Sequence, residues 1–375
     1  MRALLVFLTA LALASCAKNE VIMPLAVEDS RFADVEKIHV ATLRAPSAQA
    51  LSVFSGDRSD GLNFAEMNVS IPKNREPGTI VYPRAVANVK EQFASTGYVT
   101  NKSEEQFVAS IRAELAKKPA DERVLFVFVH GYNTNFASGV FRQAQMFKDF
   151  KFSGVAVNFS WASAGKTGLY LYDRDSAQLA RSGLRRTLQL LAKTNATNIT
   201  LVGHSMGAFV TMETLREIGI RKETHLLKRI DTLILASPDI DQRVFRDQLS
   251  NINPLPQPFV IFVSKNDRAL QASEALRGGN ARVGKGENIE ELREAGITVI
   301  DLSNLSDGQD ATNHTTFATS QTLFKMTESG AFSRDALLGA RKPDTALKPI
   351  GDGLGAVTDL AAAIIYLPAK VVGVR

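Results

Sequence analysis

The segment Ile199-Thr-Leu-Val-Gly-His-Ser-Met-Gly-Ala208 carries the strongest structural signal in the chain. Its first four residues predict a short buried strand, and a helical pattern continues from Ala208 to Ile218. Between them, Gly203-His-Ser-Met-Gly207 has the form G-x-S-x-G, in which small residues permit a sharp turn that projects the serine hydroxyl at a helix N-terminus. The pattern alone is weak, because a Gly-Ser turn without chemistry has the same form. Its position between a strand and a helix makes Ser205 the candidate nucleophile.

Short apolar runs rich in Val, Ile and Phe recur on both sides of this segment and predict strands that are buried on both faces. Helical periods separate these runs, so strands and helices alternate along the chain. Such alternation predicts right-handed crossovers and an α/β fold, with a mostly parallel central sheet and helices on both faces. The predicted strands are Val124–Val129, Val155–Phe159, Ile199–Val202, Leu233–Leu235, Phe259–Val263 and Thr298–Leu302.

Two earlier runs, His39–Leu43 and Asn63–Ile71, predict strands that no long helix separates. They fit an antiparallel hairpin at the edge of the sheet. Further along, Ser103 and Gln106 form a capping-box pattern that predicts the start of a helix.

A serine hydroxyl needs a base to act as a nucleophile near neutral pH, and the base needs a carboxylate to orient it. The chain has five His. His39 lies in a predicted edge strand, His204 lies inside the turn itself, and His225 lies in a charged stretch. His314 follows the last predicted strand, so it would lie at the same sheet edge as Ser205. We therefore predict His314 as the base; the alternative is a histidine at a helix start that local hydrogen bonds satisfy.

The acid is predicted from its position after a strand. Asp267 lies just past the run Phe259–Val263 and falls between Ser205 and His314 in the chain. This order of Ser, Asp and His is typical of enzymes with a strand–turn–helix nucleophile. Asp239 and Asp241, one strand earlier, compete with Asp267: they could serve as the acid or simply cap the following helix.

The oxyanion that forms in acyl transfer must be met by fixed hydrogen-bond donors. The turn supplies one, the backbone N–H of Met206. The second candidate is the N–H of Tyr132, because Gly131 lets the main chain curl towards the substrate after the preceding strand. His130 then holds this loop by hydrogen bonds. A competing interpretation makes His130 a metal ligand or proton carrier, but no His or carboxylate cluster stands at metal-ligand spacing nearby, so we predict neither a metal nor a cofactor.

These features together resemble the α/β-hydrolase superfamily over residues 37–328. A narrower resemblance, to bacterial esterase- or lipase-like hydrolases, rests on Phe128-Val-His-Gly-Tyr-Asn133, Asn158-Phe-Ser-Trp-Ala162, Tyr170-Leu-Tyr-Asp-Arg-Asp-Ser176 and Gly203-His-Ser-Met-Gly207. It implies a serine hydrolase with a triad of Ser205, Asp267 and His314 that cleaves acyl esters. The superfamily also includes amidases and acyltransferases, so such an activity on envelope material stays open. A lipoprotein that uses the fold as a binding module stays open as well.

The N-terminal residues have the pattern of a lipoprotein signal. Arg2 precedes an apolar stretch, Ala3–Ala14, that is too short to span a bilayer. Leu13-Ala-Ser-Cys16 resembles a lipobox, which predicts removal of residues 1–15 and acylation of Cys16. An ordinary secretory signal is the alternative. If the cell is Gram-negative, Ala17 in place of Asp favours the outer membrane, with the protein facing the periplasm.

Composition excludes several classes of protein. The net charge is +5, from 44 Lys and Arg against 39 Asp and Glu, and no run of five like charges occurs. This argues against dedicated nucleic-acid binding. Cys16 is the single cysteine, which excludes an intrachain disulfide framework, a cysteine-rich zinc site and an iron–sulfur cluster.

We predict four segments: a signal peptide (1–15), a tether (16–36), the α/β-hydrolase domain (37–328) and a C-terminal extension (329–375). The short connection from Ala236 to Phe259 leaves no room for a large cap domain. The apolar C-terminal residues either pack against the domain, which we favour, or lie on a membrane surface.

The loop Ala162–Asp175 is expected to border an open site. Within it, Leu169-Tyr-Leu-Tyr172 forms either a lip that contacts an acyl chain or ordinary packing. We expect Arg174 and Asp175 to brace this loop by a salt bridge rather than to bind substrate.

Overall fold

The computed structural model describes residue 22 and residues 29–49, 51–83, 87–101, 103–338 and 363–369. Cys16 and the signal peptide lie outside the described residues, as do parts of the tether and of the C-terminal extension. The boundaries of these segments therefore stay predictions. Among the described residues, no helix is both long enough and apolar enough to cross a membrane.

Strands and helices alternate through most of the described chain. The strands are β1 (Ala33–Pro46), β2 (Phe54–Pro72), β3 (Ala94–Asn101), β4 (Val124–Val129), β5 (Val155–Ser160), β6 (Asn198–His204), β7 (Ile230–Ala236), β8 (Phe259–Val263), β9 (Thr298–Asp301) and β10 (Ile364–Tyr366). The α-helices are α2 (Glu104–Ala116), α3 (Phe136–Asp149), α4 (Tyr170–Leu191), α5 (Met206–Ile220), α6 (Thr224–Leu227), α7 (Gln242–Ser250), α8 (Arg268–Leu276), α9 (Ile289–Glu294), α10 (Thr316–Thr319), α11 (Gln321–Glu328) and α12 (Arg334–Leu337). Ser103 and Gln106 form the predicted capping box at the start of α2.

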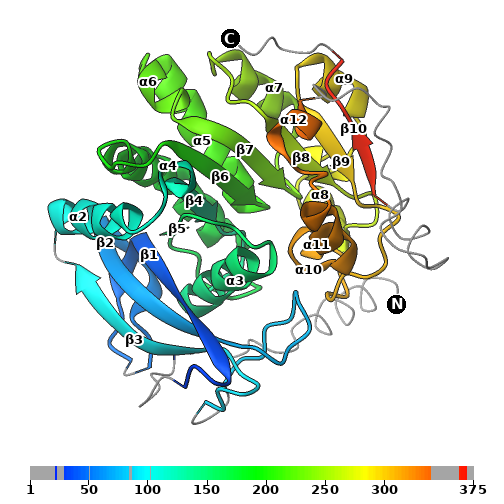
Figure 1. The fold of residues 1–375 in the computed structure, drawn as a ribbon. Coiled ribbons are helices and arrows are strands. Elements are labelled where there is room, and N and C mark those ends of the chain that lie inside the picture. The colour runs from blue at the N-terminus through cyan, green and yellow to red at the C-terminus, as the bar shows by residue number, and fades with distance from the viewer. Residues whose placement is uncertain are drawn as a thin grey trace.

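The described strands form one ten-stranded sheet in the order β10-β9-β8-β7-β6-β4-β5-β1-β2-β3 (Figure 1). From β9 to β1 neighbouring strands are parallel, whereas β10, β2 and β3 run antiparallel to their neighbours. The predicted α/β fold with a mostly parallel sheet is confirmed. Because the parallel strands end at one edge, the residues that follow them gather there.

The predicted hairpin pairs as expected but does not form the edge of the sheet. β1 pairs antiparallel with β2 on one side and parallel with β5 on the other, and β3 lies beyond β2. The sequence did not reveal β3, because Ala94-Ser-Thr-Gly-Tyr-Val-Thr-Asn101 is short of the large apolar residues that mark a buried strand.

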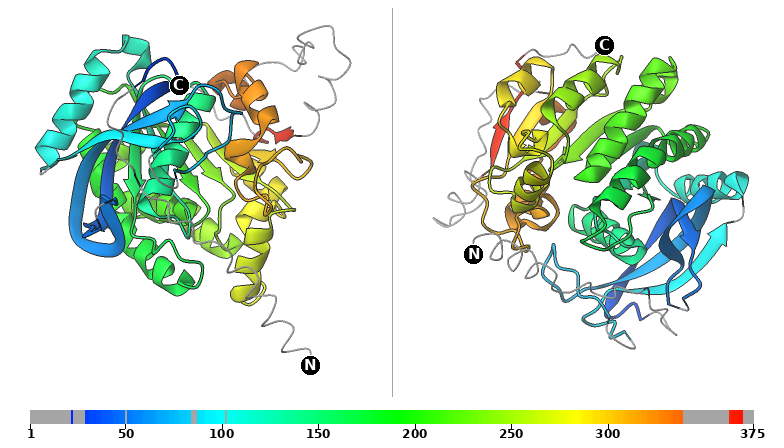
Figure 2. Two further views of the ribbon diagram at one scale, coloured as in Figure 1. Left: turned by 90° about the horizontal axis from the view of Figure 1, so that it is seen from below. Right: turned by 180° about the vertical axis from the view of Figure 1, so that it is seen from behind.

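Helices cover both faces of the sheet (Figure 2), and β4 shows how the core is divided. Its residues Leu125, Val127 and Val129 belong to the core formed with α2, α4 and α5, whereas Phe126 and Phe128 belong to the core formed with α3, α10 and α11. This alternation is the two-residue period of a strand that is buried on both faces.

Two predictions about connections can be compared with the structure. The connection between β7 and β8 holds the single helix α7, so no large cap lies at this point. At the other end of the described chain, Ile364–Tyr366 pairs with β9 as β10. This part of the C-terminal extension therefore packs against the domain, as we favoured.

Candidate active site

The turn between β6 and α5 forces the backbone of Ser205 into an unusual conformation, with φ of 54° and ψ of −119°. Such strain in a non-glycine residue typically marks a functional site. The turn also needs its flanking glycines. A Cβ on Gly207 would lie 2.3 Å from the carbonyl oxygens of Val129 and His130, and one on Gly203 would lie 2.7 Å from Thr211 Oγ1. The structure therefore explains physically why small residues flank this serine.

The structure brings together the predicted base and acid. His314 Nδ1 donates a hydrogen bond of 2.7 Å to Asp267 Oδ2. The Asp267 carboxylate is fully buried, and its second oxygen accepts from the backbone N–H of Leu270 at 2.9 Å, which caps α8. Asp267 is thus held at both oxygens. Because a carboxylate on Nδ1 fixes the tautomer of an imidazole, Nε2 of His314 is left free to act as a base.

Further hydrogen bonds fix the loop that carries His314. The Asp310 carboxylate accepts from the backbone N–H groups of Thr312, His314 and Thr315 at 2.8, 3.2 and 2.6 Å. Burial would raise the pKa of Asp310, but these bonds and those of the threonine hydroxyls lower it to about 2. Asp310 is therefore a charged anchor. The backbone N–H of Arg268 also donates to Thr312 O at 2.9 Å, which joins this loop to Asp267.

His204 connects the nucleophile turn to the base. Its Nε2 donates to the backbone oxygen of His314 at 3.2 Å, and the centres of the two rings are 4.7 Å apart. Among the described residues, no hydrogen bond joins the Ser205 hydroxyl directly to His314. The described contacts thus place the two segments side by side through His204, a role that the sequence did not reveal.

The pKa values of His314 and His204 are shifted in opposite directions. Burial acts to lower the pKa of His314, but the charge and hydrogen bond of Asp267, with the charges of Asp239 and Asp310, raise it above its ordinary value. Burial and the neighbouring His314 lower the pKa of His204 well below its ordinary value. His314 is therefore the better proton acceptor, and His204 stays neutral.

The predicted oxyanion loop lies against the nucleophile. A Cβ on Gly131 would lie 3.0 Å from Ser205 Cβ, closer than a Cβ normally approaches its neighbours, so glycine suits this position. The backbone N–H of Met206 is the first of α5 and has no acceptor within the helix. Tyr132 lies in the loop between β4 and α3, and among the described residues its backbone N–H has no backbone acceptor. Both amides have the bonding capacity that an oxyanion needs.

A buried polar network, absent from our predictions, holds the oxyanion loop in place. Asp173 is fully buried and accepts from Ser163 Oγ at 2.6 Å and from the backbone N–H groups of Ala164 and Asn133 at 2.7 and 3.1 Å. It therefore joins the start of α4 to two loops. The sequence offered one signal for a role of Asp173, which is its position inside the motif Tyr170–Ser176.

Arg44 of β1 completes this network from the other side. Its guanidinium is fully buried and donates to the carbonyl oxygens of Thr134, Ser163 and Ser55 at 2.6, 2.7 and 3.1 Å. No carboxylate lies within salt-bridge distance of Arg44 among the described residues. Burial lowers the pKa of Arg44 to about 10, which still leaves it charged at neutral pH.

His130 has the surroundings of a structural residue. Its ring stacks on Trp161 and contacts the carbonyl oxygens of Gly131 and Trp161 at 2.9 and 3.1 Å. Burial and the nearby charge of Arg44 lower the pKa of His130 to about 3. Across the described residues, no group of three or more His, Cys, Asp or Glu could hold a metal ion.

The competing acids have other partners. Asp241 caps α7 by accepting from the N–H groups of Arg243 and Val244 at 2.8 and 3.2 Å. Asp239 accepts from Tyr170 Oη at 3.2 Å and from Ser273 Oγ at 2.7 Å. Neither forms a hydrogen bond with His314.

The other histidines do not join the cluster. His39 is buried in β1 beside Ser110, and His225 lies in α6.

The expected Arg174–Asp175 brace is wrong. The described residues contain no ion pair between them, and the guanidinium of Arg174 instead lies 5.7 Å from the centre of the Phe209 ring. Successive residues at the start of a helix point in different directions, so the inward-facing Asp173 braces the loop. Tyr170 packs against Tyr132, whereas Leu171 is 77% exposed, so this lip combines packing with an apolar surface.

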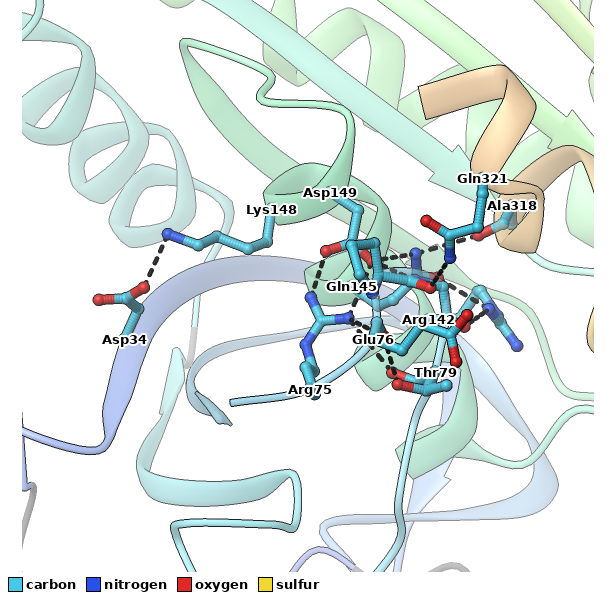
Figure 3. Close-up of polar contacts among 12 residues, drawn as sticks. Asp34, Arg75, Glu76, Thr79, Arg142, Gln145, Lys148, Asp149, Ala318 and Gln321 are labelled. Atoms are coloured by element: carbon cyan, nitrogen blue, oxygen red, sulfur yellow. Dashed lines mark hydrogen bonds and ion pairs between the residues drawn. The ribbon is translucent and has the colours of Figure 1, made fainter. Parts of the chain in front are cut away.

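The segment after β2 and the helix α3 support the two short helices, α10 and α11, that follow His314 (Figure 3). Gln321 Nε2 donates to Pro77 O at 2.6 Å, and Gln145 Nε2 of α3 donates to Ala318 O at 3.0 Å. Arg75 forms a buried ion pair with Asp149 at the end of α3. The position of α10, and with it the loop of His314, is therefore tied to α3.

Comparison with known proteins gives one family. Residues 103–337 match the model described as "Alpha/beta hydrolase of unknown function (DUF900)". No curated protein matches the chain. Among solved structures, esterases from Rhizomucor miehei share 13% identity over 79% of this chain and 81% of theirs, with a TM-score of 0.37. A thermostable esterase from Pseudomonas putida ECU1011 shares 12% identity over 79% of each chain, with a TM-score of 0.33. Similarity at this level does not transfer a substrate between proteins.

Proposed function

This chain belongs to the family of α/β-hydrolases of unknown function, and from that premise we propose that it is a serine hydrolase that cleaves carboxylic esters through an acyl-enzyme on Ser205. The observation that carries the proposal is the 2.7 Å hydrogen bond from His314 to the buried Asp267, at the sheet edge where the turn presents Ser205. A carboxylate-oriented imidazole beside a strained serine is the arrangement that activates a hydroxyl nucleophile.

The proposed reaction has two halves. Ser205 Oγ attacks the ester carbonyl carbon while His314 accepts the hydroxyl proton, and the N–H groups of Tyr132 and Met206 bind the oxyanion. His314 then protonates the leaving alcohol. In the second half, water gives a proton to His314 as it attacks the acyl carbon. The bond from that carbon to Ser205 Oγ then breaks while His314 returns the proton to Oγ, which releases the acid and restores the serine. Hydrogen bonds between nucleophile and base are often long before substrate binds and shorten in the complex.

The test is product analysis with 4-nitrophenyl esters of increasing acyl length and the matching anilides, for the wild type and Ser205→Ala. We expect the wild type to release acid and alcohol from esters faster than from anilides, and Ser205→Ala to lose this turnover. Faster cleavage of anilides, or transfer of the acyl group to an added alcohol, would reassign the reaction to an amidase or acyltransferase. Absence of turnover with every substrate would favour a binding module.

We also propose that the chain is anchored in the bacterial envelope through acylated Cys16. Support comes from the lipobox-like Leu13-Ala-Ser-Cys16 after a short apolar stretch. Cys16→Ser is expected to move the protein from the membrane fraction to the soluble fraction. Retention of Cys16→Ser in the membrane fraction would contradict the anchor.

A further inference from the structure

A pocket of about 390 Å³ is lined by residues of α4 and α5, of α7 and the segment before it, and of the segment that follows α8. These helices begin at the sheet edge that carries Ser205, because each follows a parallel strand. Phe209, one turn after Ser205 in α5, lines the pocket. The wall is continuous with the nucleophile turn, since the N–H of Asp239 donates to Ser205 O at 3.3 Å and Ile240 lines the pocket.

Three arginines line this pocket, Arg174, Arg277 and Arg282, together with the carboxylates of Glu213 and Asp241. Both carboxylates have other partners. Asp241 accepts hydrogen bonds from the backbone N–H groups at the start of α7, and Glu213 accepts a hydrogen bond from Gln248 Nε2 at 2.7 Å. Arg277 and Arg282 share a single carboxylate, that of Asp239, at 3.7 and 3.5 Å.

Arg282 is the clearest case of an incompletely paired cation. The residue is 1% exposed, and its Nη2 and Nε have no hydrogen-bond partner. Asp239 Oδ1 lies 3.5 Å from Nε, an ion pair without hydrogen-bond geometry. Burial lowers the pKa of Arg282; the charge of Asp239 opposes this effect, and that of Arg277 adds to it. A buried donor of this kind gains free energy when an anion reaches it.

The other two arginines of the pocket each lie over an aromatic ring. The guanidinium of Arg174 lies over Phe209 and, among the described residues, forms no ion pair. Arg277 lies 5.0 Å from the ring centre of Tyr170, which itself packs against Tyr132 of the oxyanion loop. The ring contact of Tyr170 with Tyr132 and the hydrogen bond from Asp239 N–H to Ser205 O connect the surroundings of these arginines to the candidate active site.

We propose that Arg174, Arg277 and Arg282 form a subsite for an anionic group, a carboxylate or a phosphate, on the substrate. The inference rests on the proposed ester hydrolase and adds the class of substrate: an ester that also carries a negative charge. The apolar Phe209 and Ile240 in the same pocket favour an anion on a short hydrocarbon arm.

The first test is binding, which does not depend on turnover. Calorimetric titration of the wild-type protein with inorganic phosphate and, separately, with glutarate is expected to give a dissociation constant of about 1 mM or below for one of them. Which of the two binds identifies the anion. Arg174→Gln and Arg277→Gln are each expected to weaken this binding about tenfold, or about 1.4 kcal/mol. Arg243→Gln, an exposed arginine of α7 outside the pocket, removes the same charge and is the matched control.

The second test compares the monoglutarate ester of 4-nitrophenol with the neutral butyrate ester. The ratio of kcat/KM for the anionic ester to that for the neutral ester should fall in Arg174→Gln and stay constant in Arg243→Gln. Failure of both anions to bind, or equal weakening in Arg243→Gln, would overturn the subsite. Anion binding without turnover of either ester would leave the subsite standing and overturn the ester hydrolase.

Discussion

The surroundings of His130 and His314 both place a serine near an imidazole, and they differ in what flanks that imidazole. In the first, Ser160 Oγ lies 3.5 Å from His130 Nε2, but both residues are buried and Arg44 is the charged neighbour. In the second, His314 follows a strand end near Ser205 and bonds to Asp267. The pKa of His130 falls to about 3, whereas that of His314 rises above its ordinary value.

The difference shows that closeness of serine and histidine does not by itself make a nucleophile. A cation beside an imidazole opposes protonation, and a carboxylate favours it. The first neighbourhood therefore has the properties of a structural pair that supports a loop, and the second has those of a base. The following predictions separate the two roles.

The largest effect is expected for His314→Ala. Loss of the base should lower kcat by about 10⁴- to 10⁶-fold, because members of a triad act as a unit. Ser160→Ala is the comparison from the first neighbourhood and should remain active, with a loss of stability of about 1–3 kcal/mol because Arg44 Nε loses its acceptor. Steady-state kinetics and thermal unfolding measure both. If Ser160→Ala were inactive and His314→Ala kept the full rate, the catalytic role would belong to the first neighbourhood instead of the second.

Asp267→Asn should come next, with kcat reduced by about 10³- to 10⁴-fold, because an amide cannot hold the productive tautomer of His314. The variant should stay folded, since Asn also caps helices well and can keep the bond to Leu270 N–H. The unfolding free energy of Asp267→Ala should be about 1 kcal/mol lower than that of Asp267→Asn, because alanine cannot cap the helix. An unchanged kcat in folded Asp267→Asn would show that the carboxylate does not orient the base.

Arg44→Met tests whether the network around Arg44 affects catalysis through the oxyanion loop that it holds in place. Removing the donors to Thr134 O and Ser163 O should destabilise the protein by about 3 kcal/mol and lower kcat about tenfold, less than loss of an oxyanion donor itself. Arg58→Met is the control from the neighbouring strand, because Arg58 is exposed and bonds Ser176 and Tyr172 outside the network. Equal effects of the two substitutions on kcat would argue against a positioning role for Arg44.

The smallest effect is a shift in pH dependence. His314 must be neutral to accept the serine proton, so kcat/KM should fall as pH drops through its pKa, with a midpoint above the ordinary value of 6.5. Asp310 contributes a negative charge that raises this pKa. Asp310→Asn should therefore move the midpoint to lower pH, by less than one unit. A midpoint that moves to higher pH would contradict the electrostatic account.

Positions that follow strand ends could be located from the sequence. Ser205, Asp267 and His314 each come soon after a short apolar run, and parallel topology places such positions at one edge. Arg44 could not be found in this way. Its acceptors Thr134 and Ser163 lie 90 and 119 residues further along the chain, and no local pattern records so distant a contact.

The direction in which a side chain points could not be predicted from the sequence either. Asp173, Arg174 and Asp175 are adjacent, and only the packing of α4 shows that Asp173 faces the two loops. β3 was missed for a related reason: a polar edge strand is specified by the strand beside it more than by its own residues.

Labelling with a fluorophosphonate, followed by peptide mass spectrometry, tests whether the serine beside His314 is the reactive one. The adduct is expected on the peptide that contains Ser205, to be absent from Ser205→Ala, and to form far more slowly in His314→Ala. An adduct on Ser160, or equal labelling of wild type and His314→Ala, would contradict the account.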